Sequence, residues 1–233
     1  MAAKTWQLQL IDGWRLRSGG RDVKVGLRQQ RLIAALALMG SQPRPFLSGL
    51  LWPESSEKQA SGSLRAAVWT ISQQLPGLLV SDNLRLGLAE SVHVDVSDFR
   101  LDTTGPMAGA TTGNRLGVRA RGDLLPGWYD DWVLEEQEQF QRRRLSALET
   151  MAENMLARGE TAGALEAAWA ALRIDPLAGN AMRLLLRAQL QEGNHAGVLS
   201  AYRDFSLRMR NEFGARLPAD ITAIVNPLLS RAV

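Results

Sequence analysis

The stretch "LWPESSEKQASGSLRAAVWTISQQL", residues 51–75, decides the fold of the front part of this 233-residue chain. Pro53 interrupts the preceding helical pattern, because the residue before a proline avoids helical backbone angles. Ser56 and Gln59 have the spacing of a capping box, which marks the start of a new helix. Since Pro76 cannot continue a helix, the sequence predicts one helix over residues 57–75.

This predicted helix has two different faces. At 100° per residue, the apolar residues share one face. They are Ala60, Leu64, Ala67, Val68, Ile71 and Leu75. The opposite face carries Lys58, Gly62, Arg65, Trp69 and Gln73, with Ser61 at its border. Packing explains the first face only, so the second face is a candidate binding surface.

The elements around this helix occur in the order of a winged helix. Residues 5–27 alternate between apolar and polar, which is typical of short antiparallel strands joined by hairpins. Residues 28–39 switch to a helical period that Gly40 ends, and a short helix follows before Pro53. Three strand-like runs then surround a turn at Asp82-Asn83. In a winged helix the third helix enters the major groove and the hairpin is the wing.

Charge and composition narrow the class of protein. Residues 1–80 contain ten basic and four acidic side chains, whereas the other 153 residues contain 17 basic and 20 acidic ones. A basic front end favours an anionic partner, nucleic acid before membrane, although surface charge by chance is the plain alternative. The absence of cysteine fits a reducing cytoplasm, and two histidines make a His-rich metal site implausible. No secretory signal or membrane-spanning run is recognisable.

The rest of the chain divides into a linker and a helical part. Residues 103–117, "TTGPMAGATTGNRLG", are rich in Gly and Thr and predict a linker. Residues 118–233 are helical in pattern and contain an internal repeat of 34 residues. Four residues recur at that spacing: Gly159, Ala162, Gly163 and Leu165 return as Gly193, Ala196, Gly197 and Leu199. This period is typical of tetratricopeptide repeats, so we predict a winged helix-turn-helix domain at 1–100 and a helical repeat domain at 118–233, mainly α overall.

Several segments resemble one family of regulators. "LLWPESSEKQASGSLRAAV", residues 50–68, resembles the winged-helix segment of the antibiotic regulatory protein family of bacterial transcriptional activators. Residues 122–153, which begin "GDLLPGWYDDWV", resemble the start of that family's bacterial transcriptional activator domain. "DPLAGNAMRLLL" and "YRDFSLRMRNEFGARLPADI" are similar to its later tetratricopeptide-type helices.

The resemblance implies an activity and partners. An OmpR-type winged helix would bind direct repeats in promoter DNA, usually as a side-by-side dimer. The helical domain would support dimerisation and contact RNA polymerase. One departure matters: family members often carry several Arg or Lys residues in the second half of the recognition helix, whereas "TISQQLPG", residues 70–77, has no charge.

The candidate DNA-binding residues each have a plain alternative. Lys58 and Arg65 are either solvated charges or contacts to phosphate and guanine. Trp69 either packs in the core under the hairpin or lies at the edge of the groove. At the expected wing tip, turn chemistry alone explains Asn83, whereas Arg85 could contact phosphate or the minor groove. Arg44, before the second helix, is a candidate phosphate contact, and Ser61, Gly62 and Gln73 complete the candidate surface.

Two further groups of residues lie in the predicted helical domain. Asp130 and Asp131 precede Trp132 at a helix start, where capping explains them better than acid–base catalysis. Trp128, Tyr129 and Trp132 are expected to anchor that helix. The run Arg142–Arg144 turns three ways around a helix, so a solvated face is the first interpretation and an interface the second.

We therefore predict a cytoplasmic, sequence-specific transcriptional activator that is not an enzyme and needs no cofactor or metal. No phosphate loop, nucleophile motif or metal spacing occurs in the chain. Its expected partners are double-stranded promoter DNA, RNA polymerase and a second protomer, with no membrane. The alternative is a protein-interaction adaptor that uses its helical repeats and has weakened or lost DNA binding.

Overall fold

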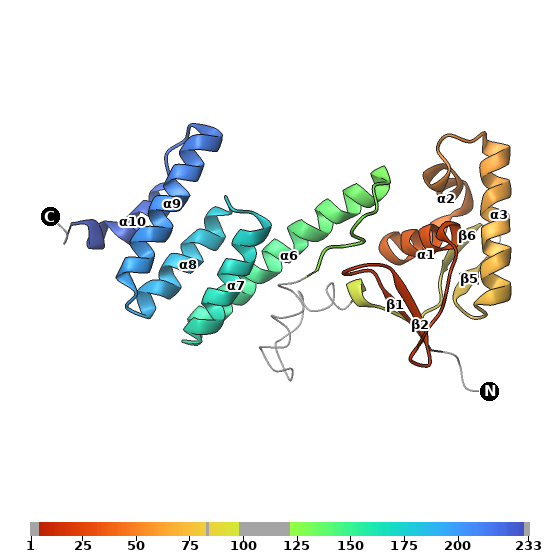
Figure 1. Ribbon diagram of the computed structural model, residues 1–233, viewed down its shortest axis with the longest axis horizontal. Coiled ribbons are helices and arrows are strands. Elements are labelled where there is room, and N and C mark those ends of the chain that lie inside the picture. Colours follow the sequence, from red (N-terminus) through yellow and green to blue (C-terminus); the bar gives the residue numbers. More distant parts are fainter. Residues whose placement is uncertain (1–4, 83, 98–121, 231–233) are drawn as a thin grey trace. The chain divides into compact units, whose positions relative to one another are not determined.

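A computed structural model describes residues 5–82, 84–97 and 122–230 (Figure 1). Contacts between Cα atoms divide the chain into two compact units, each described by itself below. The first contains residues 1–106 and 123–137, and the second contains residues 107–122 and 138–233. The expected linker at 103–117 lies outside the described residues.

The first unit begins with a four-stranded sheet in the order β3-β2-β1-β7. Its strands are β1 (Trp6–Gln9), β2 (Arg15–Ser18), β3 (Arg21–Asp22) and β7 (Val92–Val94). The first three form the predicted antiparallel hairpins, whereas β7 pairs in parallel with β1, so that Leu8 lies opposite Val94. Trp6, Leu8 and Leu16 are buried on one face of this sheet, as their alternation in the sequence predicted.

Three helices follow, as the sequence predicted, and Figure 1 shows them beside the sheets. They are α1 (Leu27–Met39), α2 (Arg44–Leu51) and α3 (Glu57–Gln74). Gly40 ends α1 with a positive φ of 75°, a conformation that favours glycine. The predicted stripe of α3 is buried at Ala60, Leu64, Ala67, Ile71 and Leu75, while Val68 is half-buried. Leu75 follows the last helical residue, so α3 ends one residue before the predicted boundary.

The wing is a small second sheet in the order β4-β6-β5. It consists of β4 (Gln42–Pro43), β5 (Leu79–Ser81) and β6 (Arg85–Leu88). The hairpin of β5 and β6 is antiparallel, with Ser81 opposite Leu86. Residues 79–88 therefore form the hairpin, which starts two residues earlier than the predicted 81–88, and Asn83 lies outside the described residues.

Residues 123–137 lie with the first unit, although the sequence assigned them to the helical domain. The backbone N–H of Asp12 donates to the carbonyl of Asp123 at 2.9 Å, and that of Leu125 donates to Leu10 at 2.8 Å. Arg31 of α1 forms an ion pair with Asp130, in which both side chains are about 30% exposed. The segment thus pairs with residues 10–12, directly after β1, through an isolated bridge between Ile11 and Leu124, and it is held to α1. A local sequence pattern does not predict such contacts between residues far apart in the chain.

Helix α6 (Asp131–Ala157) starts in the first unit and continues from Glu138 in the second. The second unit also contains α7 (Thr161–Ile174), α8 (Gly179–Gln191), α9 (His195–Phe213) and α10 (Ala219–Leu229). Gly159 and Gly193 have positive φ angles of 75° and 72° at equivalent turns of the 34-residue repeat. The small residues of α7, among them Ala164, Ala167 and Ala171, are buried, which lets the neighbouring helices approach closely.

Two expectations for residues 128–144 were wrong in part. Trp132 is buried, but Tyr129 is 80% exposed and so does not anchor α6. Arg142 and Arg143 are exposed as expected, whereas Arg144 is 4% exposed. Its guanidinium donates to the carbonyl of Gly122 at 2.7 Å and to Gln141 at 3.0 Å, and it lies 5.7 Å from the ring centre of Phe140. A helical run of three arginines places one on the inner face, where backbone and aromatic partners replace water.

Candidate nucleic-acid interface

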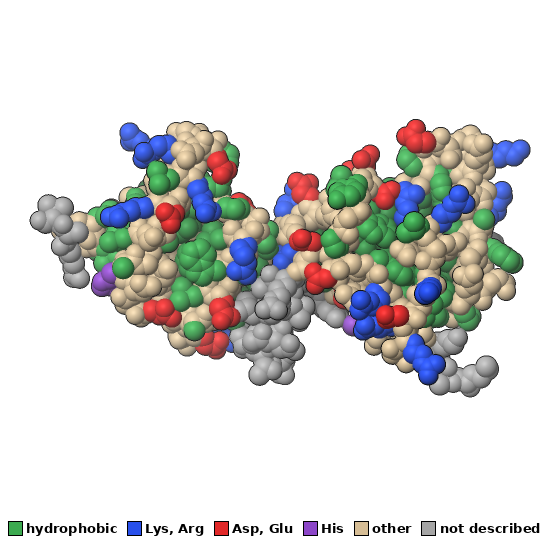
Figure 2. Space-filling view, in the orientation of Figure 1, with side chains coloured by type: hydrophobic (Ala, Val, Ile, Leu, Met, Phe, Trp, Pro, Cys, Tyr) green, Lys and Arg blue, Asp and Glu red, His purple; other side chains and the backbone are tan. Residues whose placement is uncertain are grey.

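The candidate surface is the outer face of α3. Lys58, Arg65 and Gln73 are exposed, and Ser61 and Gly62 are half-buried beside them. Lys58, Gly62, Arg65 and Gln73 lie opposite the buried stripe and Ser61 lies at its border, because the helical period separates the two sets. Figure 2 shows basic side chains and hydrophobic ones projecting along α3. The structure therefore brings the predicted α3 residues together on one accessible face.

The start of α3 is fixed by its cap. The backbone N–H of Ser56 donates to Gln59 Oε1 at 3.3 Å, and the Ser56 hydroxyl donates to the same atom at 3.0 Å. The first of these bonds gives a partner to the backbone N–H of the N-cap residue, which has none within the helix. Because Lys58 lies in this first turn, the cap also determines where its cation is presented.

Neither Trp69 nor Gly62 on this face is explained by packing of α3 against the rest of the unit. Trp69 is 67% exposed, so the structure does not bury it under the hairpin, which was one of its two interpretations. A Cβ built on Gly62 meets no atom within 4 Å, so no packing contact requires a glycine there. A glycine inside a helix is unfavourable by about 1 kcal/mol relative to alanine, and here no structural need offsets that cost.

Two arginines connect the wing hairpin to α2 and to Ser41, which follows α1. Arg44, the first residue of α2, donates to the Ser81 hydroxyl at 2.7 Å. Arg85 of β6 donates to the carbonyl of Ser41 and also to its hydroxyl, the latter at 3.4 Å. Both arginines thus position the wing, a role that the sequence did not predict. Because a guanidinium has five donors, each keeps donors for a further ligand.

The wing turn is organised by Asp82. Its carboxylate accepts from the backbone N–H of Arg85 at 2.5 Å and from that of Leu84 at 2.8 Å. These two bonds, together with the charges of Arg85 and Arg44, hold the pKa of Asp82 below its ordinary value of 3.8. Asp82 is therefore ionised at neutral pH, and its negative charge interacts with both arginines at the wing.

The wing also exposes hydrophobic side chains that sequence reasoning missed. Leu84 is 76% exposed and Val80 is 59% exposed. Leu86 and Gly87 of β6 are buried, whereas Val80, which pairs with Gly87, is exposed, and the letters of residues 79–88 do not alternate in a way that separates the two groups. With the neutral end of α3, residues 70–74, these side chains give the surface a mixed apolar and basic character.

The described residues contain no arrangement that would hold a metal ion: across 5–82, 84–97 and 122–230 there is no group of three or more histidine and carboxylate side chains. Nor does any helix there have the length and apolar character needed to cross a membrane.

The first unit has the architecture of a winged helix, and the second is built of tetratricopeptide-like helix pairs. In the chain, a winged helix-turn-helix domain is thus followed by a helical repeat domain. Residues 120–229 match the family model described as the bacterial transcriptional activator domain. The match covers just under half of the chain and agrees with the resemblance of residues 122–153 to the start of that domain.

A solved structure supports the fold of nearly the whole chain. The structure of Mycobacterium tuberculosis EmbR in complex with a low-affinity phosphopeptide is similar with a TM-score of 0.78 and 18% sequence identity. The match covers 98% of this chain and 66% of that one, so the chain spans just under two thirds of the EmbR structure. At this identity the likeness is one of fold. No curated protein matches the sequence.

Proposed function

We propose that this protein binds promoter DNA sequence-specifically, with α3 in the major groove and the β5–β6 hairpin as the wing. The observation that carries the proposal is the outer face of α3. It combines exposed cations, an exposed Trp69 and a glycine without a packing role, all opposite a largely buried apolar stripe. A helix of this kind, third in a winged helix, is the element that enters the groove.

The chemistry of the face supports specific roles. Arg65 is suited to a bidentate contact with guanine O6 and N7, while Lys58 in the first turn is suited to phosphate. Arg44 and Arg85 would use their remaining donors for phosphate, and Trp69 and Gln73 would contact sugar or base edges near the end of the helix. Ser61 and Gly62 allow the backbone to approach the groove, and Asn83 belongs to the same expected surface.

The proposal includes the other partners of an activator. The helical unit would contact RNA polymerase or a second protomer, and a dimer would bind direct repeats. A protein that acts on promoters in this way would work in the cytoplasm, without a cofactor and without catalysis. The domain family supports an activator, and these contacts are our proposal for how it acts.

Fluorescence anisotropy with a labelled promoter fragment and a scrambled duplex tests DNA binding, with Arg65→Gln as the variant. Loss of a bidentate base contact should weaken specific binding by about 1–3 kcal/mol and relax specificity at one position. Arg21→Gln is the matched control, because Arg21 is an exposed arginine on β3 in the other sheet. Equal affinity for both duplexes, unchanged by Arg65→Gln, would refute the proposal.

A second candidate function is that of a protein-interaction adaptor with lost DNA binding. The observation in its favour is the end of α3, where residues 70–74 carry no charge. Neutralising several phosphates makes DNA binding steeply dependent on salt. The adaptor therefore predicts no salt-dependent binding to any duplex, whereas the activator predicts a linear fall of log K with log salt concentration.

A further inference from the structure

The second unit contains an open pocket of about 220 Å³ between α7, α8 and α9. Its floor is formed by Leu172, Met182, Ala201 and Phe205, which are all buried. Trp169 forms one wall and is 46% exposed, although it lies on a helix whose other apolar residues are mostly buried alanines. A cavity of roughly 150 Å³ with apolar walls can hold benzene, so this pocket has room for one large apolar side chain.

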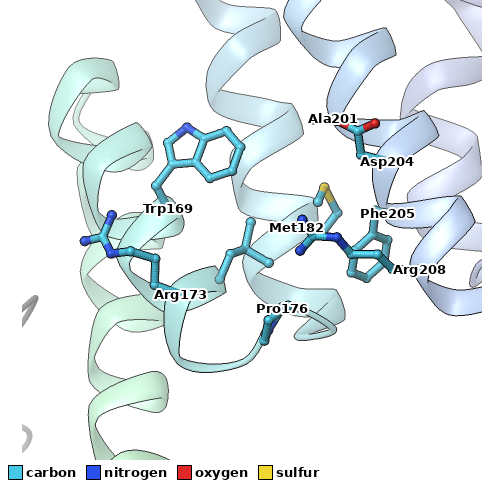
Figure 3. Close-up of a pocket in the computed structure, with 9 residues that line it drawn as sticks. Trp169, Arg173, Pro176, Met182, Ala201, Asp204, Phe205 and Arg208 are labelled. Carbon is cyan, nitrogen blue, oxygen red and sulfur yellow. The ribbon is translucent and has the colours of Figure 1, made fainter. Parts of the chain in front are cut away.

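The rim of the pocket is charged and mostly positive. Figure 3 shows Trp169 and Arg173 projecting from α7 on one side, and Asp204, Phe205 and Arg208 from α9 on the other. Arg173 and Arg208 are exposed. Within residues 122–230, neither arginine forms an ion pair or a hydrogen bond. Two guanidiniums without partners beside an apolar pocket favour a ligand that supplies anionic groups next to an apolar anchor.

The occupant that fits is a peptide segment of another protein. Concave surfaces of stacked helical repeats commonly bind extended or helical peptides. Arginine and exposed tryptophan are also the residue types that most often dominate binding energy at protein interfaces. Asp204 adds one negative charge on the side away from Arg173, which suits a backbone N–H or a basic side chain at that end of the ligand.

We propose that this pocket, defined by Trp169, Arg173, Met182, Asp204, Phe205 and Arg208, binds a partner protein through a segment in which a large apolar side chain is flanked by carboxylates. The inference deepens the proposed function and rests on its helical half, the contact with another protein. It assigns that contact to the pocket and specifies the side chains expected in the bound segment.

Selection of random dodecapeptides displayed on phage, with the full chain as bait, tests the chemistry directly. The expected consensus has an aromatic or large aliphatic residue next to Asp or Glu. Reversal of both rim charges, in Arg173→Glu/Arg208→Glu, should exchange the acidic residues of the consensus for basic ones. No consensus, a basic consensus for the natural chain, or the same peptides from the reversed variant would each overturn the proposal.

Anisotropy of one selected, labelled peptide then measures the contribution of each side chain. Trp169→Ala should weaken binding by at least about tenfold, as expected for the centre of an interface. Arg173→Gln and Arg208→Gln should each weaken it roughly two- to fivefold, because both arginines are exposed. Arg203→Gln is the matched control, since Arg203 is an exposed arginine of α9 outside the pocket, and it should leave the affinity unchanged. An unchanged affinity in Trp169→Ala would overturn the proposal.

Two further measurements separate this proposal from its rivals. Sedimentation of the chain alone should be the same for the natural protein and Trp169→Ala; a lower oligomeric state in the variant would place a second copy in the pocket and overturn the proposal. DNA binding should be unchanged in all pocket variants. If the natural chain binds no DNA but selects acidic peptides that depend on Trp169, the DNA proposal has failed and the pocket proposal has held.

Discussion

Gly62→Ala should make the protein more stable and weaken its binding to DNA. Gly62 is the sixth residue of the 18-residue α3, and a Cβ at this position meets no atom within 4 Å. The added methyl group therefore meets no clash in the free protein, and the lower entropy of the unfolded chain should stabilise it by about 0.5–1 kcal/mol. In the complex, the same methyl group would stand between the backbone of α3 and the floor of the groove.

The magnitude of the binding defect follows from the size of one lost contact. If the methyl group displaces α3 enough to disturb one base pair, the cost is about 1–3 kcal/mol, or on the order of tenfold in affinity. Denaturant unfolding and duplex anisotropy on the same preparation measure both effects. A destabilised protein would contradict the open geometry around Gly62, and a stabilised protein that keeps full affinity would refute the close approach of α3 to DNA.

Gly49→Ala is the matched control for this prediction. Gly49 lies in α2, is exposed, and likewise has no atom within 4 Å of a built Cβ. The two substitutions make the same chemical change in a helix, but only Gly62 belongs to the candidate surface. Gly49→Ala should raise stability in the same direction and leave the DNA affinity unchanged, which separates an effect at the interface from an effect on folding.

Three further predictions concern contacts within a single unit, the first in the second unit and the other two in the first. Arg144→Met leaves the carbonyl of Gly122 without its buried donor and should destabilise the second unit by about 1–3 kcal/mol in calorimetry; an unchanged melting temperature would contradict the burial of this contact. Asp130→Ala removes the partner of Arg31 and should lower the free energy of unfolding by about 1 kcal/mol. Hydrogen exchange in residues 123–137 should become faster in the variant, and exchange rates there equal to those of the natural chain would contradict the prediction. The pKa of Asp82 is lowered in the folded state, so its stabilising effect on the wing is present above pH 3.8 and is lost as the pH falls through the folded pKa. A carboxyl titration by NMR with a midpoint at or above 3.8 would contradict the two backbone bonds to Asp82.

The start of α3 and its buried face were predictable because the sequence signals for both are local. Ser56 and Gln59 of the capping box lie three residues apart, and Pro53 marks the break between α2 and α3. The buried stripe follows from the helical period, and its opposite face follows from the stripe. The exposure of Trp69 could not be predicted in this way. A tryptophan at this position can lie in a core or on a surface, and only the path of the hairpin decides which.

The contacts that the sequence did not predict join residues far apart in the chain. The parallel pairing of β1 with β7 aligns Trp6 with Val92, and the Arg31–Asp130 ion pair spans 99 positions. A single sequence gives the period of each segment but not which segments meet. The burial of Arg144 could not be predicted for a similar reason. Which face of a helix is buried is known only when the segment packed against it is known.

The role of the wing arginines also required the structure. Arg44 and Arg85 were predicted as contacts to DNA, and both also bond to serines that connect the wing to the helices. A substitution at either position therefore changes the position of the wing as well as charge. For this reason Arg65, with no such bond within the described residues, is the better probe of DNA recognition.

Selection of random duplex DNA by the full chain tests the central claim, that α3 reads sequence, most directly. The account predicts enrichment of duplexes that share a repeated half-site, binding that weakens linearly with log salt concentration, and relaxed selection at one position of the half-site in Arg65→Gln. Recovery of duplexes without a common sequence, with the natural chain and Arg65→Gln indistinguishable, would contradict it.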